Sequence, residues 1–146
     1  MKKTLMALIL SMSTLPLAAI GGPIRCMPDH AELDCLALNI YHESKGEPHL
    51  GQIGVAAVTM NRVFSGRFAN GICKVVKQKY QFSWVHLKKD HSARGKAWEQ
   101  SREVAYKYLN GSYEDPTKGA LYFHAKHVNP NWNFKRKAVI GGHIFY

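Results

Sequence analysis

The chain has few acidic residues and no internal repeat. Ten Asp and Glu stand against twenty Lys and Arg, which gives a formal charge of +10. An excess of basic groups favours an anionic partner, such as nucleic acid, anionic lipid or the peptide carboxylates of a bacterial cell wall. A merely solvated basic surface would have the same composition, so charge alone does not choose. With 146 residues, of which 46% are hydrophobic, the chain suffices for one domain with a real core.

The sequence also lacks the short motifs of common metal and nucleophile sites. It contains neither His-Glu-x-x-His nor Cys-x-x-Cys, although it has eight histidines. His124 and His127 would share one face only in a helix, and Pro130 disfavours a helix there. Ser44 and Ser83 do not stand in a Gly-x-Ser-x-Gly sequence, which disfavours a serine nucleophile. We therefore expect no metal and no cofactor, and keep a zinc site that uses His124 as an alternative that excess chelator would detect.

The longest mostly apolar run, residues 5–20, is shorter than the roughly 20 residues of a usual membrane span. Lys2 and Lys3 precede it and small residues follow it, which is the layout of a secretory signal. We predict a signal peptide at 1–21 and a mature domain at 22–146, with an uncleaved signal-anchor as the alternative. Removal of the signal takes away two lysines and lowers the formal charge from +10 to +8. The protein is then expected in the periplasm or outside the cell, peripheral to the membrane at most.

Cysteines are few, and their number is odd. An exported protein with Cys26, Cys35 and Cys73 is expected to hold a disulfide. Cys35 lies in a predicted helix, and Cys73 follows a predicted turn, so we pair these two. Spacing and context alone support this choice, and pairings with Cys26 remain open.

The most informative segment is 35–48, which indicates an apolar helix that ends on an acid. Three- and four-residue spacing predicts one buried helix face, made of Leu33, Leu36, Ala37 and Ile40. Glu43 follows one turn later in the same row, and Gly46 and Pro48 end the helix. A partly desolvated carboxyl group has a raised pKa and suits proton donation near neutral pH. A glutamate in a last helical turn is more commonly just solvated, so position alone does not assign the role.

The remaining elements are predicted from apolar spacing and from turn residues. The helices are 51–64, with an apolar row that ends at Phe64, and 97–109, while 72–79 fits a short helix or a strand and 88–96 a polar loop. Two β-prone segments, 120–124 and 139–146, lie near the C-terminus. We expect them to pair as a small β-hairpin. The predicted fold class is therefore α+β, mainly helical, in a single domain.

Three segments combine aromatic rings with amides, hydroxyls or histidine, and they are 81–84, 122–124 and 129–132. Cleavage of a glycosidic bond needs a carboxylic acid at the leaving oxygen and a surface that holds sugar rings. Amides and hydroxyls bind sugar hydroxyl groups, and ring faces cover the apolar C–H faces. Apolar rings are usually buried, so Phe82, Phe123 and Phe145 are expected in the core. Tyr122 and Trp132 fit either role.

Taken together, the chain resembles the SleB-type cell wall hydrolase family, the catalytic domain of spore-cortex-lytic enzymes. The matching segments occur in family order over nearly all of the mature chain, and they are 35–48, 51–63, 72–76, 81–84, 119–124 and 140–146. The resemblance implies a lysozyme-like fold similar to that of lytic transglycosylases. It also implies peptidoglycan glycan strands as the substrate, cut between N-acetylmuramic acid and N-acetylglucosamine. The family's essential glutamate corresponds to Glu43. Ser44-Lys45 departs from the usual small residue and arginine, and a lysine cannot bind a carboxylate bidentately.

The resemblance implies a mechanism with one carboxyl group. Glu43 protonates the glycosidic oxygen and then deprotonates the muramic C6 hydroxyl, which attacks C1 and leaves a 1,6-anhydro end. An internal nucleophile needs no second carboxylate, which suits a chain with few acids. If Glu47 or Asp90 acted as base for a water, the enzyme would be an N-acetylmuramidase that hydrolyses the bond. Two further alternatives are a metal-dependent N-acetylmuramoyl-L-alanine amidase and a non-enzymatic basic module that binds the wall.

Polar and aromatic side chains of the matching segments are expected to contact the substrate, and they are Glu47, Asn61, Gln81, Ser83, Tyr122, His124 and Trp132. Glu47 has an alternative role as an anchor for its loop. Asn61 and Gln81 either line the cleft or satisfy buried backbone groups. We expect a monomer that binds glycan strands and no nucleic acid.

Overall fold

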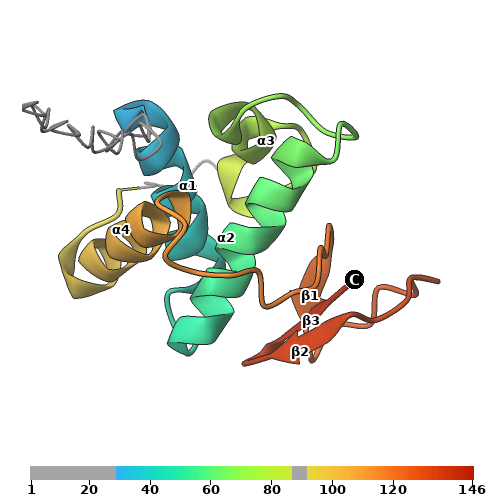
Figure 1. Ribbon diagram of the computed structural model, residues 1–146. Coiled ribbons are helices and arrows are strands. Elements are labelled where there is room, and N and C mark those ends of the chain that lie inside the picture. The colour runs from blue at the N-terminus through green and yellow to red at the C-terminus, as the bar shows by residue number, and fades with distance from the viewer. Residues whose placement is uncertain (1–28, 87–91) are drawn as a thin grey trace, which may run out of the picture.

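The computed structural model describes residues 29–86 and 92–146. The predicted signal segment 1–21, Cys26 and Asp90 lie outside these residues. Within them the chain forms helices α1 (His30–Ser44), α2 (His49–Phe64), α3 (Ile72–Lys77) and α4 (Gly95–Leu109), the short 3-10 helix η1 (Ser83–His86), and strands β1 (Phe123–Ala125), β2 (Ala138–Ile140) and β3 (His143–Phe145) (Figure 1). The mainly helical α+β class predicted from the sequence is confirmed.

Helix α1 begins at a side-chain cap and buries one face against three neighbours. The Asp29 carboxylate accepts a hydrogen bond from the Ala31 N–H at 3.2 Å, which satisfies one of the free amide groups at the helix start. The predicted apolar row, from Leu33 to Ile40, is buried along its length. This row packs among α2, α3 and α4, so α1 stands at the centre of the helical part.

Helix α2 is apolar on nearly all sides, as expected of a helix inside a core. Its residues from Val55 to Val58 are fully buried. The helix begins at His49, two residues before the predicted start, because Pro48 at the N-cap has a φ of −54° that already suits helix entry. Phe64, at the end of the predicted row, is 78% exposed, so the buried face ends before it.

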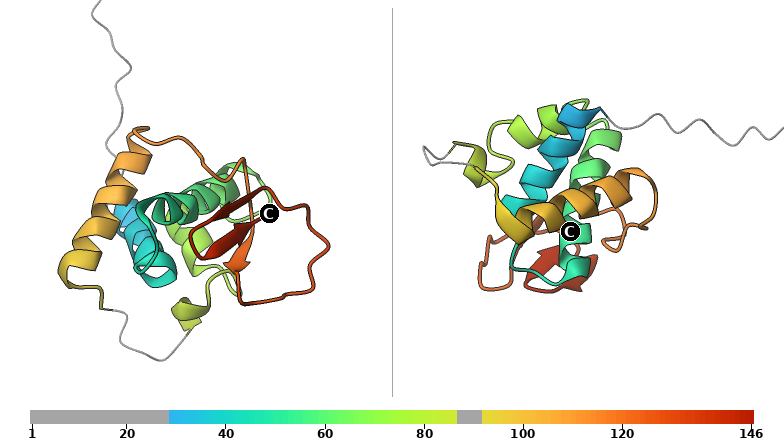
Figure 2. Two further views of the ribbon diagram at one scale, coloured as in Figure 1. Left: turned by 90° about the horizontal axis from the view of Figure 1, so that it is seen from below. Right: turned by 90° about the vertical axis from the view of Figure 1, so that its left-hand side faces the viewer.

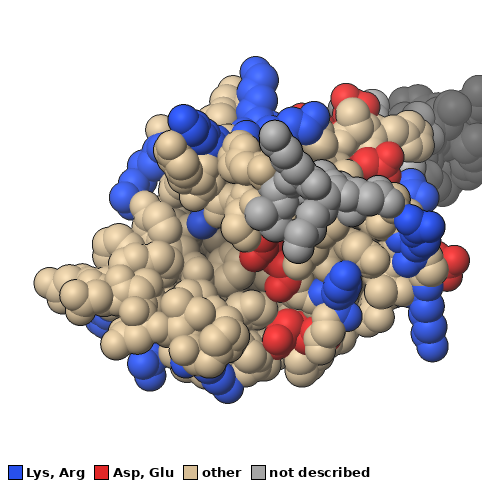
Figure 3. Space-filling model, turned by 180° about the vertical axis from the view of Figure 1, so that it is seen from behind, with Lys and Arg blue, Asp and Glu red and all other residues tan. Residues whose placement is uncertain are grey.

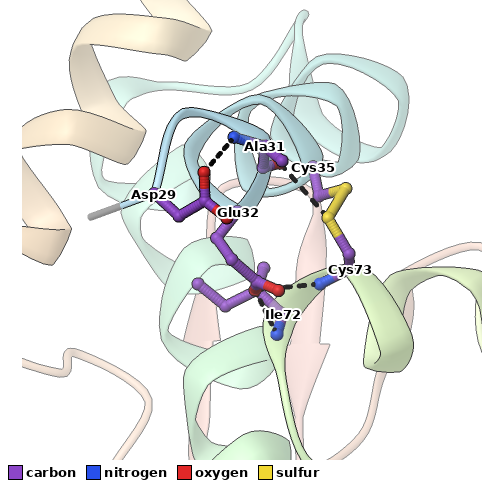
Figure 4. The surroundings of a disulfide bond; sticks show 6 residues. All are labelled: Asp29, Ala31, Glu32, Cys35, Ile72 and Cys73. Atoms are coloured by element: carbon purple, nitrogen blue, oxygen red, sulfur yellow. Dashed lines mark hydrogen bonds between the residues drawn. A yellow bond between two sulfur atoms is a disulfide. The ribbon is translucent and has the colours of Figure 1, made fainter.

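A disulfide and a carboxylate join α1 to the start of α3. Cys35 and Cys73 form the bridge, with an S–S distance of 2.03 Å, so the pairing predicted from the sequence is present. One turn earlier, the Glu32 carboxylate accepts hydrogen bonds from the N–H groups of Ile72 at 2.6 Å and Cys73 at 3.1 Å (Figure 4). These N–H groups lack partners within the helix, so Glu32 caps α3 from another element.

The three strands form one antiparallel sheet in the order β1-β3-β2. The expected pairing of the two C-terminal segments is present as β1 with β3, which places Phe123 opposite Phe145. The missed part is β2, because residues 138–146 also fold back on themselves. Gly141 has a φ of +55°, which suits a two-residue hairpin turn and lets Ile140 pair with His143. The predicted strand 120–124 is shifted to Phe123–Ala125.

The sheet lies beside α2, on the side of the molecule away from α4 (Figures 1 and 2). Phe145 is fully buried between the sheet and the helix, as expected for a core ring. A Cβ atom at Gly54 would come within 2.9 Å of the Phe145 ring, so the glycine allows this close approach. No helix of the described residues has the length and apolar character that a bilayer span needs.

Candidate active-site cleft

A cleft of about 880 Å³ opens between the helical part and the sheet. The end of α1, the end of α2, the segment before and within η1, and strands β1 and β3 supply its walls, through Glu43, Arg62, Lys79, Tyr80, Gln81, Phe82, Ser83, His86, Phe123, His124, Ala125, Val128 and His143. Figure 3 shows this side of the molecule hollowed, with lysines and arginines mostly around its outer edge. The lining thus combines one carboxyl group, several polar groups and several rings.

Glu43 reaches this cleft from the last turn of α1, where the predicted apolar row ends. Burial raises the pKa of Glu43 to about 7, and the positive charge of Arg62 limits the rise. No described residue donates a hydrogen bond to the carboxyl group, which leaves burial free to favour its neutral form. The desolvated position inferred from spacing is therefore the one that Glu43 occupies, and near pH 7 it can hold a proton or release one.

Arg62 is the positive charge beside Glu43, and it was not among the residues predicted for the site. Only 4% of its surface is exposed, and its Nε donates to the Leu121 carbonyl at 2.8 Å. Its guanidinium carbon lies 4.8 Å from the centre of the Phe82 ring, a cation–π contact. Burial lowers the pKa of Arg62 to about 10, a value at which it stays charged at neutral pH. One signal was available, since Arg62 lies one and two turns beyond the buried Val58 and Val55 on one helix face.

The segment before and within η1 lines the cleft with consecutive residues. Phe82 is buried, as expected, while Gln81 and Ser83 line the cleft, as expected of substrate contacts. Tyr80 also lines it, with a φ of +67° and 82% of its surface exposed. Lys79 Nζ lies 4.8 Å from the centre of the Tyr80 ring. A left-handed backbone is uncommon for a residue with a large side chain.

His124 and His143 form the sheet wall of the cleft. The Ala125 carbonyl lies 2.8 Å from His124 Nδ1 and can only accept, so Nδ1 carries the proton and Nε2 accepts from the Tyr146 hydroxyl at 2.9 Å. Both ring nitrogens of His124 are thus engaged. The described residues contain no group of three His, Cys, Asp or Glu side chains placed to hold a metal ion.

Glu47 anchors the β2–β3 turn to the loop between α1 and α2. Its Oε2 accepts a hydrogen bond from the Gly142 N–H at 2.6 Å and lies 4.0 Å from His143 Nδ1. Burial lowers the pKa of His143, while the Glu47 carboxylate acts in the opposite direction. Glu47 is not among the residues that line the cleft. Of its two predicted roles, the loop anchor is the one that these contacts describe, and the substrate contact stays a prediction.

The contacts of Asn61 are also with other parts of the fold. Its Nδ2 donates to the Asp115 carboxylate at 2.9 Å and to the Ala120 carbonyl at 3.1 Å, which ties α2 to the segment before β1. Of the two predicted roles, the structure therefore has Asn61 satisfying a backbone group, and its side chain does not line the cleft.

Tyr122 and Trp132 lie outside the Glu43 cleft, in a neighbouring aromatic cluster. The Tyr122 and Phe134 rings are stacked at 4.9 Å, and Trp132 lies 6.0 Å from Tyr122 and 5.6 Å from His124. Both residues were expected to contact substrate or to pack, and their rings pack against one another while Trp132 stays 41% exposed.

The chain is similar in sequence to known proteins. Residues 46–146 match the family model described as Cell Wall Hydrolase, a match that begins three residues after Glu43. The spore cortex-lytic enzyme of Bacillus cereus is 35% identical over 119 residues, which cover 78% of this chain and 43% of that protein. The chain thus spans less than half the length of this relative.

Solved structures show the same likeness in three dimensions. The catalytic domain of the Bacillus cereus SleB protein has a TM-score of 0.70 and 31% identity, and the match covers 86% of this chain and 98% of that one. The catalytic domain of the germination-specific lytic transglycosylase SleB from Bacillus anthracis has a TM-score of 0.65 and 30% identity, over 80% and 94% of the two chains. The fold predicted by resemblance is thereby confirmed.

Proposed function

This chain belongs to the Cell Wall Hydrolase family, and we propose that it cleaves peptidoglycan glycan strands as a lytic transglycosylase. The bond cut is the β-1,4 link from N-acetylmuramic acid to N-acetylglucosamine. The observation that carries this proposal is the Glu43 carboxyl group, which is desolvated, has a pKa raised to about 7, and is open to the cleft. A solved structure named as a lytic transglycosylase, at 30% identity, supports the same reaction class.

In the first step, Glu43 donates its proton to the glycosidic oxygen as the bond to C1 of muramic acid breaks. A pKa of about 7 suits a group that must give up a proton and then take one back. In the second step, the Glu43 carboxylate removes the proton of the C6 hydroxyl, whose oxygen bonds to C1. The products are a 1,6-anhydro end and a free hydroxyl on N-acetylglucosamine, and Glu43 is protonated again.

A cleft with a single carboxyl group fits transglycosylation better than hydrolysis, which uses two carboxyl groups. Among the described residues that line the cleft, Glu43 alone carries a carboxyl group. Glu47, considered as a base for water, is engaged with Gly142. An internal hydroxyl nucleophile removes the need for a second carboxylate, whereas inverting hydrolysis requires one on the far side of the sugar.

Arg62 and the polar rim complete the proposed roles. The electrostatic interaction between Arg62 and Glu43 becomes more favourable as Glu43 loses its proton. Arg62 therefore stabilises the carboxylate formed midway through the reaction. Gln81 and Ser83 present hydrogen-bonding groups to the sugars, the ring of His124 forms part of the cleft wall, and Tyr80 offers a ring face at the rim. The substrate lies outside the inner membrane, so the proposal includes export, in agreement with the predicted signal at 1–21.

The test is the substitution Glu43→Gln, which keeps shape and removes the titrating proton. We expect release of soluble fragments from purified sacculi to fall by a factor of about 10² to 10⁴, the usual contribution of a general acid or base. Mass spectrometry of the wild-type digest should find anhydro ends, which are lighter by one water than reducing ends. Glu114→Gln, which alters an exposed carboxylate, serves as the control. Normal clearing by the Glu43→Gln protein, or a digest of reducing ends or free peptides, would overturn the proposal.

A further inference from the structure

A second, smaller hollow of about 220 Å³ lies beside the cleft. Apolar, aromatic and basic side chains line it, and they are Arg67, Leu121, Tyr122, Phe134, Lys135, Lys137 and Tyr146. These residues come from the segment after α2, the strand region before β1, the segment before β2, and the last residue of the chain. The lining contains no acidic side chain.

The aromatic part of this hollow is exposed to an unusual degree. Phe134 is 48% exposed although its ring stacks on Tyr122 at 4.9 Å, and the neighbouring Trp132 is 41% exposed. Large rings that meet one another at the surface, with basic groups around them, are typical of recognition surfaces rather than of a core. The stacking holds the rings in place, so they form a preformed wall for a ligand.

Two of the three basic groups are held by hydrogen bonds to uncharged partners. Arg67 Nη2 donates to the Tyr122 hydroxyl at 3.4 Å, and Lys137 Nζ donates to the Gly119 carbonyl at 2.6 Å. Within residues 29–86 and 92–146, no side-chain or terminal carboxylate forms an ion pair with Arg67, Lys135 or Lys137. Three positive side-chain charges therefore surround one small hollow that has no acidic side chain, and the main-chain oxygen of Tyr146 is occupied by the N–H groups of Leu121 and Tyr122 at 2.8 and 3.2 Å. The excess of positive charge favours an anionic group of a ligand.

This hollow adjoins the Glu43 cleft across a single wall of side chains. Arg62 lines the cleft, and its guanidinium carbon lies 5.9 Å from the ring of Tyr122, which lines the hollow. His124 lines the cleft as well, and its ring centre is 5.6 Å from that of Trp132. A branched ligand can thus occupy the cleft with one arm and the hollow with another.

We propose that the hollow binds a carboxylate of the peptide stem that peptidoglycan carries on its muramic acid. Stem peptides branch from the glycan strand and bear free carboxylates together with small apolar side chains. Arg67, Lys135 and Lys137 match the carboxylate, and the Tyr122–Phe134 stack matches the apolar part. This inference rests on the proposed function and makes peptide-bearing strands the preferred substrate.

The experiment measures binding in the Glu43→Gln protein, so that cleavage is not needed. Two insoluble substrates are compared at constant salt, namely intact sacculi and sacculi stripped of stem peptides by an amidase. Two charge-matched variants are added to this protein, Lys135→Gln with Lys137→Gln, and Lys74→Gln with Lys77→Gln on the exposed side of α3. A third variant, Lys135→Gln alone, removes no hydrogen bond among the described residues. Thermal unfolding checks that every variant is folded.

We expect the parent protein to bind intact sacculi about tenfold more tightly than stripped ones. The Lys135/Lys137 variant should lose this preference while binding stripped sacculi as before, and the Lys74/Lys77 variant should keep it. Equal losses in both variants, an equal loss on stripped sacculi, or no loss at all would overturn the inference. These outcomes are separate from the proposed function, which depends on the ends that the wild-type enzyme produces.

Discussion

Glu47 and Gly142 share a hydrogen bond of 2.6 Å although they lie 95 residues apart in the sequence. The bond joins the loop between α1 and α2 to the β2–β3 turn. Glu43 lies four residues before Glu47, and His143 follows Gly142, so the contact lies next to two residues that line opposite parts of the cleft.

The first prediction concerns the space that this contact requires. In Gly142→Ala the new Cβ would lie 2.6 Å from Glu47 Oε1, which would displace the carboxylate from the amide it accepts from. A lost hydrogen bond to a charged group costs about 1.5–3 kcal/mol, so we expect the free energy of unfolding to fall by about 2 kcal/mol and sacculus cleavage to weaken. Urea denaturation and fragment release measure the two effects.

Gly46→Ala is the matched control for that substitution. A Cβ at Gly46 meets no atom within 4 Å, so this variant should resemble the wild type in both measurements. If Gly142→Ala proved as stable and as active as Gly46→Ala, the Glu47–Gly142 contact would have no part in holding the cleft.

The second prediction concerns stability and pH. Burial raises the pKa of Glu43 from 4.5 in the unfolded chain to about 7 in the folded one, so between these values the folded state binds more protons. The free energy of unfolding contributed by this group is therefore full below pH 4.5 and is lost as pH rises through about 7. This difference in pKa corresponds to a change of about 3 kcal/mol at most in the free energy of unfolding.

Glu43→Gln does not titrate, so it should gain stability relative to the wild type as pH rises. We expect the difference in unfolding free energy between variant and wild type to grow by up to about 3 kcal/mol from pH 4 to pH 8. Urea denaturation at both pH values measures it, with the exposed Glu114→Gln as control. A difference that stayed constant with pH would mean that Glu43 is not desolvated.

A third prediction links Arg62 to the pH dependence of cleavage. The initial rate at low substrate should decline above about pH 7, as Glu43 loses the proton that it must donate. The Arg62 charge lowers the pKa of Glu43, so in Arg62→Gln the decline should move to higher pH. The variant should also be less stable by about 1–3 kcal/mol, because the bond from Nε to Leu121 is altered.

Lys74→Gln removes one positive charge from the exposed side of α3 and should leave the position of this decline unchanged. A decline that moved to lower pH in Arg62→Gln would contradict the assignment of Arg62 as the cation that acts on Glu43.

The fourth prediction concerns the disulfide. Cys35 and Cys73 are separated by 38 positions, and closing a loop of that length restricts the unfolded chain by about 4 kcal/mol in the chain-entropy model. Replacing both with alanine should lower the free energy of unfolding by about 2–4 kcal/mol, measured by urea denaturation under oxidising conditions. Cys26→Ala should have no such effect, and a loss of equal size there would point to a different pairing.

Much of the helical fold was predictable because it depends on local spacing. The row from Leu33 to Ile40 is buried as expected, and Glu43 is desolvated where that row ends. The sheet was less predictable. Strand pairing depends on contacts between distant segments, and the segment predicted as one strand of the hairpin, 139–146, holds parts of two strands that pair with each other.

Some residues of the cleft could likewise be predicted from the sequence, and others could not. Gln81, Ser83 and His124 were predicted as substrate contacts and line the cleft. Arg62 was missed because a charged residue near a helix end is normally solvated, and its burial among rings depends on segments that arrive later in the chain. Tyr122 was predicted in the same group but belongs to the adjoining hollow, a distinction that local sequence does not contain.

The backbone at Tyr80 has one more consequence. A left-handed residue with a side chain costs about 1–2 kcal/mol, and glycine would adopt the same φ of +67° without that strain. The substitution Tyr80→Gly is therefore expected to increase the stability of the fold. It would also remove from the cleft rim an aromatic ring that is 82% exposed. A substitution at position 80 that raises thermal stability is therefore expected to lower the rate of cleavage.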